Sequence, residues 1–208
     1  VPAIDFLMWT LVGFLSGSVP WSLILSKYIS GKDARDVGDG NPGATNAWIS
    51  SGWIVGILAM ILDIGKATVP VWFLMSSLDP SSFADHLLTA IGVISPVVGH
   101  ACSPFLGFKG GKALASSWGS WIAITYGLAF PVALVILGMM HLIQKNHAIT
   151  VTTCLAFFVI IFGFLDGLDY LIIFGLFNLA LIGYKHRTEY SKGLIVRSWI
   201  RRLPGRDY

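Results

Sequence analysis

The strongest constraint on this chain is a series of seven mostly apolar stretches, most of them long enough to cross a lipid bilayer as helices. A membrane-spanning helix requires about 17 to 25 mostly apolar residues. With 55% hydrophobic and only 12% charged residues, the chain is predicted to be an all-α, polytopic membrane protein. The stretches cover residues 6–29, 48–75, 86–106, 114–128, 130–143, 148–164 and 170–184.

The fourth and fifth stretches are separated by a single residue, and Pro131 interrupts the apolar pattern. Proline inside a helix removes a backbone hydrogen bond and kinks or ends the helix. Two interpretations stay open: a hairpin of two short helices, or one long kinked segment.

The basic residues give an independent test of the number of stretches. Lys and Arg favour short cytoplasmic loops. If the stretches alternate across the membrane from an outer N-terminus, thirteen of the fourteen Lys and Arg residues fall on the inner side, and the outer connections have none. The exception is Lys66, inside the second stretch. We therefore predict about seven transmembrane helices, with the N-terminus outside and the C-terminus in the cytoplasm.

No repeat or charged linker divides residues 1–208, so one integral-membrane domain is expected. The first stretch has no basic segment before it, which favours a retained helix over a cleaved signal peptide. Cys102 and Cys154 lie in different stretches without metal-ligand spacing, so no disulfide framework or metal site is expected. Topology accounts for the basic residues, so no nucleic acid partner is expected. The basic tail around Trp199 is predicted to contact anionic membrane lipid.

Residues 37–46 read Val-Gly-Asp-Gly-Asn-Pro-Gly-Ala-Thr-Asn and lie between the first two stretches. Glycine lets backbone N–H groups approach an anion closely, and Thr and Asn add side-chain donors. The run therefore predicts an anion-binding loop at the membrane surface. Its candidate binding residues are Gly38, Asp39, Gly40, Asn41, Gly43, Ala44, Thr45 and Asn46.

Asp63 and Lys66 are ionisable residues inside the second stretch. Such groups are costly in lipid unless they are paired or hydrated. On a helix, residues three apart share one face and can form an ion pair. The pair either only fixes helix packing, or it lets Lys66 help to hold an anion.

A third cluster runs from His100 to Lys112. Lys109 and Lys112 flank Gly110 and Gly111 just before the next stretch, which suits a second anion site near a helix N-terminus. The cluster is no nucleotide-binding P-loop, because that motif requires Ser or Thr after its lysine, and here Ala113 follows. The lysines could also be ordinary membrane-surface anchors.

Four motifs in this order resemble the PlsY-type acyl-phosphate:glycerol-3-phosphate acyltransferases. The resemblance covers practically the whole chain. The motifs are Gly-Asp-Gly-Asn-Pro-Gly-Ala-Thr-Asn at 38–46, Asp-Ile-Gly-Lys at 63–66, Gly-His at 99–100 with Phe-Lys-Gly-Gly-Lys at 108–112, and His-Arg at 186–187.

The resemblance implies a seven-helix enzyme of the bacterial inner membrane that works without a cofactor. Such an enzyme transfers a fatty acyl group from acyl phosphate to the 1-hydroxyl of glycerol 3-phosphate and forms lysophosphatidic acid for phospholipid biosynthesis. Because acyl phosphate is a mixed anhydride, its carbonyl is already activated. Catalysis then mainly requires two anions to be held together and an oxyanion to be stabilised.

The resemblance also implies roles for single residues. Asn41, Lys109 and His186 are the expected catalytic residues. The glycine run would cradle one phosphate, Lys112 would neutralise charge together with Lys109, and Arg187 would lie near the acceptor. The remaining expected binding residues are Asp63, Lys66, His100, Gly110 and Gly111. Three alternatives stay open for the base, namely His100, His186 and a substrate phosphate.

Four positions depart from the family pattern. Asp39 replaces a serine, Ile49 an arginine, Ala67 a glycine, and Glu189 or a neighbour an asparagine. The substitutions remove one cation and add two carboxylates, which makes the acceptor site less cationic. Alternatives to acylation of glycerol 3-phosphate are therefore a different acceptor, or a non-catalytic membrane subunit or lipid-binding protein. A transporter would predict paired halves, and no such symmetry is visible.

Overall fold

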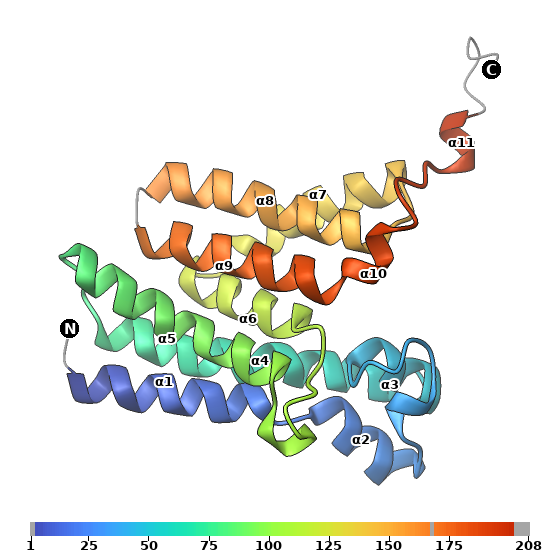
Figure 1. Cartoon of the computed structure of the whole chain (residues 1–208), viewed down its shortest axis with the longest axis horizontal. Coiled ribbons are helices and arrows are strands. Elements are labelled where there is room, and N and C mark those ends of the chain that lie inside the picture. The colour runs from blue at the N-terminus through green and yellow to red at the C-terminus, as the bar shows by residue number, and fades with distance from the viewer. Residues whose placement is uncertain (1–2, 167–168, 202–208) are drawn as a thin grey trace.

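The predicted all-α class is confirmed by a computed structural model, which describes residues 3–166 and 169–201. These residues form helices joined by short loops, without a β-strand; one isolated bridge joins Gln144 and Val196. Figure 1 shows two layers, α7, α8 and α9 above and α1, α4 and α5 below, with α6 between them. The long helices are α1 (Ala3–Ser18), α4 (Trp53–Ser77), α5 (Phe83–Ala101), α7 (Ala129–Ile143), α8 (His147–Asp166) and α9 (Asp169–Lys185).

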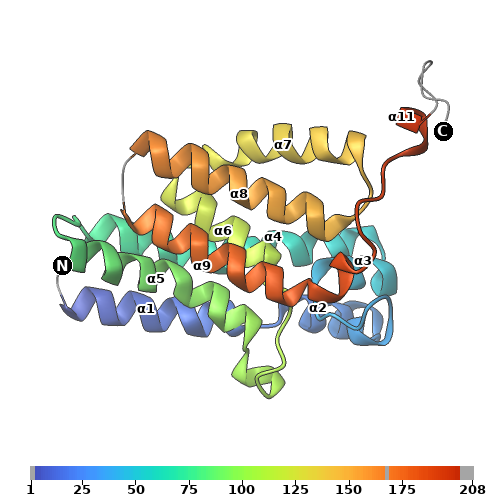
Figure 2. The ribbon, with the colours of Figure 1, turned by 45° about the horizontal axis from the view of Figure 1, so that its top comes forward.

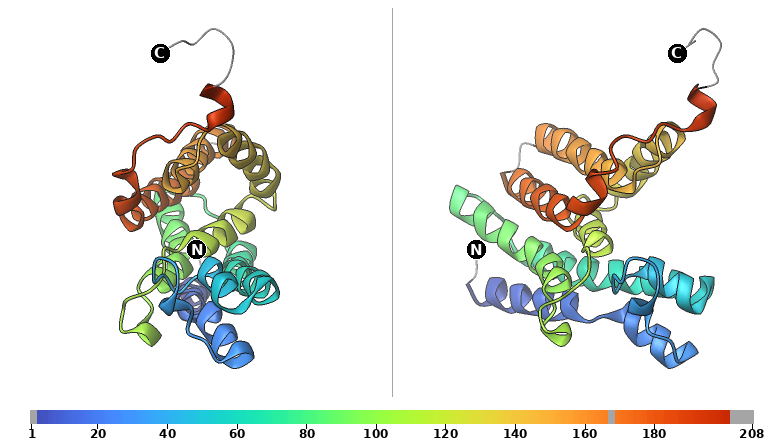
Figure 3. Two further views of the ribbon diagram at one scale, coloured as in Figure 1. Left: turned by 90° about the vertical axis from the view of Figure 1, so that its right-hand side faces the viewer. Right: turned by 45° about the vertical axis from the view of Figure 1, so that its right-hand side comes forward.

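The first predicted stretch, 6–29, is two helices rather than one. It divides at Val19 and Pro20 into α1 and α2 (Trp21–Ser30). Proline has no N–H with which to continue the helical hydrogen bonds. At this break the carbonyl of Val19 accepts the backbone N–H of Trp21 at 3.1 Å and the ammonium of Lys66 at 2.7 Å. In Figure 3, α2 turns away from the direction of α1.

The second predicted stretch, 48–75, also divides. Gly52, with φ +91°, ends the short helix α3 (Ala44–Ser51) and precedes α4. Residues 48–51 therefore belong to α3 and lie beside the glycine run instead of in the long helix. The following connection leads to α5, whose N-terminus has a capping box formed by Ser82 and Asp85.

The fourth and fifth stretches are two separate helices, α6 (Leu114–Ile124) and α7. They are joined by a turn in which Gly127 has φ +91°. Pro131 lies in the first turn of α7, where its missing N–H costs no helical hydrogen bond. The expectation that Pro131 breaks the pattern is wrong: the break precedes it. With 11 residues, α6 is only about 16 Å long.

Aromatic side chains fill the space between α6, α8 and α9. Trp121 is fully buried and packs against Phe158, Phe162 and Phe174. Its indole N–H donates to the side-chain oxygen of Asn178 at 3.2 Å, which satisfies the polar group inside the core. This core holds α6 against the upper layer.

The lower layer is held by close backbone contacts. A Cβ on Gly17 would lie 2.1 Å from the carbonyl oxygen of Pro96, and one on Gly99 would lie 2.2 Å from that of Phe14. Only glycine therefore lets α1 and α5 pack this closely.

Within the described residues, three helical segments are long and apolar enough to cross a membrane: Ala3–Ser30, Trp53–Ser77 and Phe83–Leu106. Ala129–Ile143 and His147–Gly163 are shorter apolar helices. Figure 2 shows α1, α4, α5, α8 and α9 running in roughly one direction, with α2, α3 and α10 (Arg187–Tyr190) at the end away from the N-terminus. In the tail, Arg202 and Arg206 lie outside the described residues.

Candidate functional site

The glycine run forms a loop that ends at the N-terminus of α3. Gly38 and Gly40 have φ +61° and +72°, a left-handed conformation that favours glycine. A Cβ on Gly38 would also lie 2.3 Å from the side-chain oxygen of Asn46. Gly43 precedes α3 and no side chain caps this helix. The N–H groups of its first turn therefore lack intrahelical partners and, with the helix dipole, can hold an anion.

Asp39 is held by the protein through both carboxylate oxygens. Its Oδ1 accepts hydrogen bonds from the backbone N–H of Asn41 at 3.1 Å and from Nδ2 of Asn46 at 3.0 Å. Its Oδ2 lies 2.6 Å from Nζ of Lys112. Partial burial favours the neutral acid, but these partners outweigh it and hold the pKa of Asp39 below its usual range. The carboxylate is thus a structural part of the loop.

Lys112 connects three segments that are distant in the sequence. Its backbone N–H donates to Oδ1 of Asn41 at 3.0 Å, and its Nζ contacts both Asp39 and Oε1 of Glu189. Burial favours the neutral amine, but the two carboxylates outweigh it and raise the pKa of Lys112. Lys112 is therefore a charged lysine at the junction of the glycine run and the C-terminal segment.

The paired glycines next to Lys112 serve packing. A Cβ on Gly110 would lie 2.1 Å from the carbonyl oxygen of His100, and one on Gly111 would lie 2.4 Å from its Nε2. The N–H of Gly111 donates to the same carbonyl at 3.0 Å. The glycines thus let this loop lie directly on the end of α5. Lys109, in contrast, is exposed.

Asp63 and Lys66 form the predicted ion pair inside the protein. Lys66 Nζ lies 2.7 Å from Asp63 Oδ1, and the two side chains are only 3% and 2% exposed. Asp63 Oδ2 accepts a hydrogen bond from Ser22 at 2.7 Å. The same ammonium donates to the carbonyl at the break between α1 and α2. The pair therefore fixes the packing of α1, α2 and α4, while Asp63 also borders the main pocket.

His186 is oriented by the end of α9. Its Nδ1–H donates to the carbonyl of Ile182 at 2.9 Å, so Nε2 of the neutral ring is available as a proton acceptor. Burial lowers the pKa of His186 below its usual 6.5, although the carboxylate of Glu189 opposes this shift. Arg187 is exposed, and its guanidinium lies 4.4 Å from the ring centre of Tyr184.

The segment 189–195 is hydrogen-bonded to the connection between α7 and α8. Nδ2 of Asn146 donates to the carbonyls of Glu189 at 3.0 Å and Gly193 at 2.8 Å. The backbone N–H of Lys145 donates to the carbonyl of Ile195 at 2.8 Å. These bonds fix the backbone that carries Glu189 beside Lys112.

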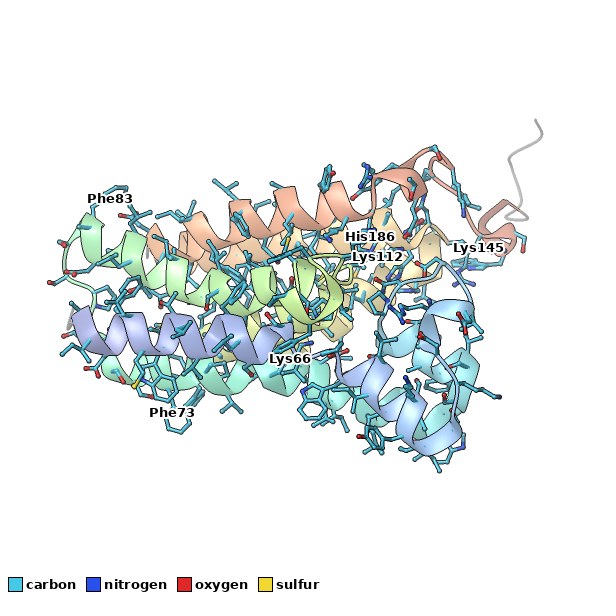
Figure 4. All side chains as sticks on the ribbon, turned by 60° about the horizontal axis from the view of Figure 1, so that its bottom comes forward. Lys66, Phe73, Phe83, Lys112, Lys145 and His186 are labelled. Atoms are coloured by element: carbon cyan, nitrogen blue, oxygen red, sulfur yellow. The ribbon has the colours of Figure 1, made fainter. Side chains whose placement is uncertain are left out.

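Many of these residues border a pocket of about 920 Å³. Figure 4 shows Lys112, Lys145 and His186 toward the same end of the molecule, away from Phe83. One part of the pocket is polar and basic. The other part is apolar and reaches between α3, α4 and α6, where it is lined by Ile49, Met60, Ile64, Ala113, Leu114, Ala115 and Trp118.

Most of the predicted binding residues border this pocket, which brings together motifs from the whole chain. Those that line it are Gly38, Asp39, Asn41, Gly43, Ala44, Thr45, Asn46, Asp63, His100, Lys112 and His186. Gly111 and Lys66 line a small neighbouring cavity with His100. The lining of either space does not include Gly40, Lys109, Gly110 or Arg187. Among the described residues, no group of three or more His, Cys, Asp or Glu side chains could hold a metal ion.

The sequence profile of the family described as "Glycerol-3-phosphate acyltransferase" matches residues 7–194. The chain belongs to this glycerol-3-phosphate acyltransferase family. A relative of this name from Chlorobium phaeobacteroides is 33% identical, over 86% of this chain and 88% of that protein. "Glycerol-3-phosphate acyltransferase 1" of Thermotoga maritima is 43% identical, over 55% of each chain, so that alignment spans only about half of the relative.

Two solved structures have the same fold. The crystal structure of PlsY (YgiH), described as an integral membrane glycerol 3-phosphate acyltransferase, was determined in a glycerol 3-phosphate form. It has a TM-score of 0.79 and 28% identity, with 90% of each chain covered. Its lysophosphatidic acid form has a TM-score of 0.77 and 26% identity at the same coverage. This glycerol-3-phosphate acyltransferase family member is accordingly an integral membrane protein.

Several polar residues of the pocket are not among the site candidates expected from the sequence. Lys145 and Lys192 fit the general pattern of basic inner loops, and that pattern cannot distinguish lysines that border a site. The start of α8 offered a signal, because Asn146 and His147 follow Lys145 directly. The additional polar pocket residues are Lys145, Asn146, His147, Thr188 and Lys192, and Glu189, which the sequence showed only as a departure from the family pattern, also lines the pocket.

Proposed function

We propose that this chain transfers a fatty acyl group from acyl phosphate to the 1-hydroxyl of glycerol 3-phosphate and releases lysophosphatidic acid and inorganic phosphate. Family membership supports this activity. The observation that carries the proposal is the pocket, in which a basic, polar part adjoins an apolar part between helices. The reaction needs such a junction, because the acyl phosphate combines a charged phosphate with a hydrocarbon chain and the acceptor is itself a charged, polar molecule.

The uncapped N-terminus of α3 is the proposed seat of one phosphate. Its backbone N–H groups point their positive dipole ends at an anion, and Thr45 and Asn46 add side chains at this end of the pocket. Asn41 holds the backbone of Lys112 against the loop. Asn41 thus keeps Lys112 beside the activated carbonyl. Two of the three ammonium N–H groups of Lys112 face Asp39 and Glu189, and the third can donate to the oxyanion that develops on the carbonyl.

The second phosphate requires cations other than Lys112, since two carboxylates already neutralise that lysine. Lys145 and Lys192 border the same pocket and supply this charge. They replace the positive charge that is missing at Ile49, which also borders the pocket. Lys109 and Arg187 are exposed and act from the surface by attracting the anionic substrates.

His186 is the proposed proton acceptor. Its Nε2 takes the proton of the 1-hydroxyl as the hydroxyl oxygen bonds to the carbonyl carbon, and the bond from that carbon to the phosphate oxygen then breaks. Phosphate leaves with the electron pair of this bond. The neutral ring suits this role because a general base must be unprotonated at the working pH.

The distribution of basic residues supports a position in the bacterial inner membrane with the pocket facing the cytoplasm. Lys112 and Lys145 lie at the same end of the molecule, far from the end of α5 that carries Phe83 (Figure 4). Lys and Arg concentrate on the cytoplasmic side of membrane proteins. The soluble acceptor would therefore enter from the cytoplasm, while the acyl chain comes from the bilayer.

The test is phosphate release by the purified protein in lipid nanodiscs supplied with acyl phosphate, with and without glycerol 3-phosphate. We expect release that depends on the acceptor, with lysophosphatidic acid as the lipid product. Lys32→Ala, an exposed lysine outside the pocket, is the control for Lys112→Ala, which should lose activity. A folded protein without acceptor-dependent release would contradict the proposal. Release that depends on another alcohol would indicate a changed acceptor.

A further inference from the structure

Glu189, the only glutamate of the chain, has one carboxylate oxygen free in the pocket. Its Oε1 contacts Nζ of Lys112. In the described part of the chain no residue donates to Oε2, and the side chain borders the pocket and is 22% exposed. Asp39, on the same lysine, has partners for both of its oxygens. The two carboxylates are therefore unequal: both oxygens of Asp39 have protein partners, whereas Oε2 of Glu189 has none among the described residues and can accept a hydrogen bond from a ligand.

The position of Glu189 is fixed by its backbone. The Asn146 side chain donates to the carbonyls of Glu189 and Gly193. Oδ1 of Asn146 in turn accepts from the N–H of Ala148 at 3.1 Å in the first turn of α8. The backbone of Glu189 is thus hydrogen-bonded to the residue that precedes α8. These bonds favour a fixed position of the carboxylate in the pocket.

A free carboxylate oxygen recognises one kind of ligand group. It only accepts hydrogen bonds, so it binds hydroxyl donors and repels a phosphate. Glycerol 3-phosphate has a phosphate at one end and two hydroxyls at the other. Its phosphate is therefore expected to turn away from Glu189, toward Lys145 and Lys192, and its hydroxyl end is expected to face Glu189.

We infer that Glu189 selects the acceptor by accepting a hydrogen bond from its 2-hydroxyl at Oε2. This inference rests on the proposed function and adds a specificity-determining residue to it. The 1-hydroxyl then remains free to attack the acyl carbonyl. A site that hydrogen-bonds a substrate hydroxyl strongly rejects an analogue without it, because its own polar group is left unpaired.

The test compares glycerol 3-phosphate with propane-1,3-diol monophosphate, which lacks only the 2-hydroxyl. For the wild-type protein we expect kcat/KM to be at least about tenfold lower with the analogue. In Glu189→Ala this ratio should fall to below about twofold, and Glu189→Gln should lie between. Asp36→Asn removes an exposed carboxylate outside the pocket and should keep the wild-type ratio. An unchanged ratio in Glu189→Ala would overturn the inference.

Two further measurements separate the possible failures. If the wild-type protein acylates neither acceptor, the proposed function fails. Selection can then be measured as binding without turnover. The rise in Tm that glycerol 3-phosphate causes is compared with the rise that the analogue causes, in the wild-type protein and in Glu189→Gln. If the two acceptors differ in Tm rise by the same amount in both proteins, the inference about Glu189 is overturned, whatever the outcome for the proposed function. If Glu189→Ala does not fold, Glu189→Asp, which keeps the carboxylate but shortens its reach, replaces it, and it should lose discrimination.

Discussion

The side-chain oxygen of Asn41 accepts a hydrogen bond from the backbone N–H of Lys112 at 3.0 Å. This bond joins the glycine run to the loop before α6. It holds the lysine backbone while the ammonium pairs with Asp39 and Glu189. The two loops can therefore keep a fixed distance while substrates enter and leave.

Removing this bond should affect activity more than stability. Asn41→Ala leaves the N–H of Lys112 unpaired and lets the loop shift, and a misplacement of about 1 Å can lower the rate about 100-fold. Asn41→Asp keeps an acceptor oxygen and should retain more activity, although its charge lies close to Asp39. Steady-state kinetics and thermal unfolding in detergent measure the two effects. Equal activity of wild type and Asn41→Ala would contradict the prediction.

The sequence predicts features that depend on neighbouring residues. Apolar stretches gave the helical membrane class, because the hydrocarbon thickness dictates their length. The ion pair of Asp63 and Lys66 is predictable from the sequence because a helix places residues three apart on one face. The glycine run was recognisable because few other purposes require so many glycines and donors together.

Contacts between distant segments could not be predicted in this way. Lys112 meets Glu189 across 77 residues, and no local pattern carries that pairing. Pro20 and Gly52 lie inside the predicted stretches 6–29 and 48–75. The continuous apolar length of these stretches predicts one helix each, so the sequence does not reveal the two helix breaks. Gly110 was expected to bind an anion, yet its contact with the carbonyl of His100 gives it a packing role.

Substitution of one member of the buried ion pair should destabilise the protein strongly. Lys66→Met leaves the Asp63 carboxylate unpaired, which costs about 3 to 5 kcal/mol for a buried pair. The double variant Asp63→Asn with Lys66→Met should recover much of this loss. Asp33→Asn breaks the exposed pair with Arg35 and should cost about 1 kcal/mol or less. Unfolding by SDS titration measures all variants, and additive losses in the double variant would contradict the pairing.

Alanine at Gly110 should disturb the loop that carries Lys112. Its Cβ would lie 2.1 Å from the backbone carbonyl of His100, and overpacking of this kind costs about 1 to 3 kcal/mol. We expect lower thermal stability together with a raised KM. Gly138→Ala is the control, because its Cβ meets nothing within 4 Å and alanine favours the helix. Similar behaviour of the two variants would show that close packing at Gly110 is unimportant.

Trp118 should influence which acyl chains are accepted. It lines the apolar part of the pocket and packs edge to face against Phe158 at 5.4 Å. Close by, α4 and α6 touch, since a Cβ on Gly119 would lie 2.2 Å from the carbonyl of Ile64. Trp118→Ala should widen the pocket and raise the kcat/KM ratio of palmitoyl to lauroyl phosphate severalfold. Trp53→Ala, an exposed tryptophan outside the pocket, should leave the ratio unchanged.

The pH dependence should reveal the state of His186. Its pKa in the folded protein lies below 6.5 because the ring is buried, so the ring is neutral at neutral pH and kcat/KM should fall as the pH drops through this lowered pKa. The unfolded chain takes up the proton more readily, so the stability contributed by the neutral ring is present above pH 6.5 and is lost as the pH falls through the folded value. His186→Gln should lower the rate at least about 100-fold and abolish both acid-side losses. If the acid limb of kcat/KM persists unchanged in the variant, it belongs to the substrate phosphate, and the proposed role of His186 as proton acceptor is wrong.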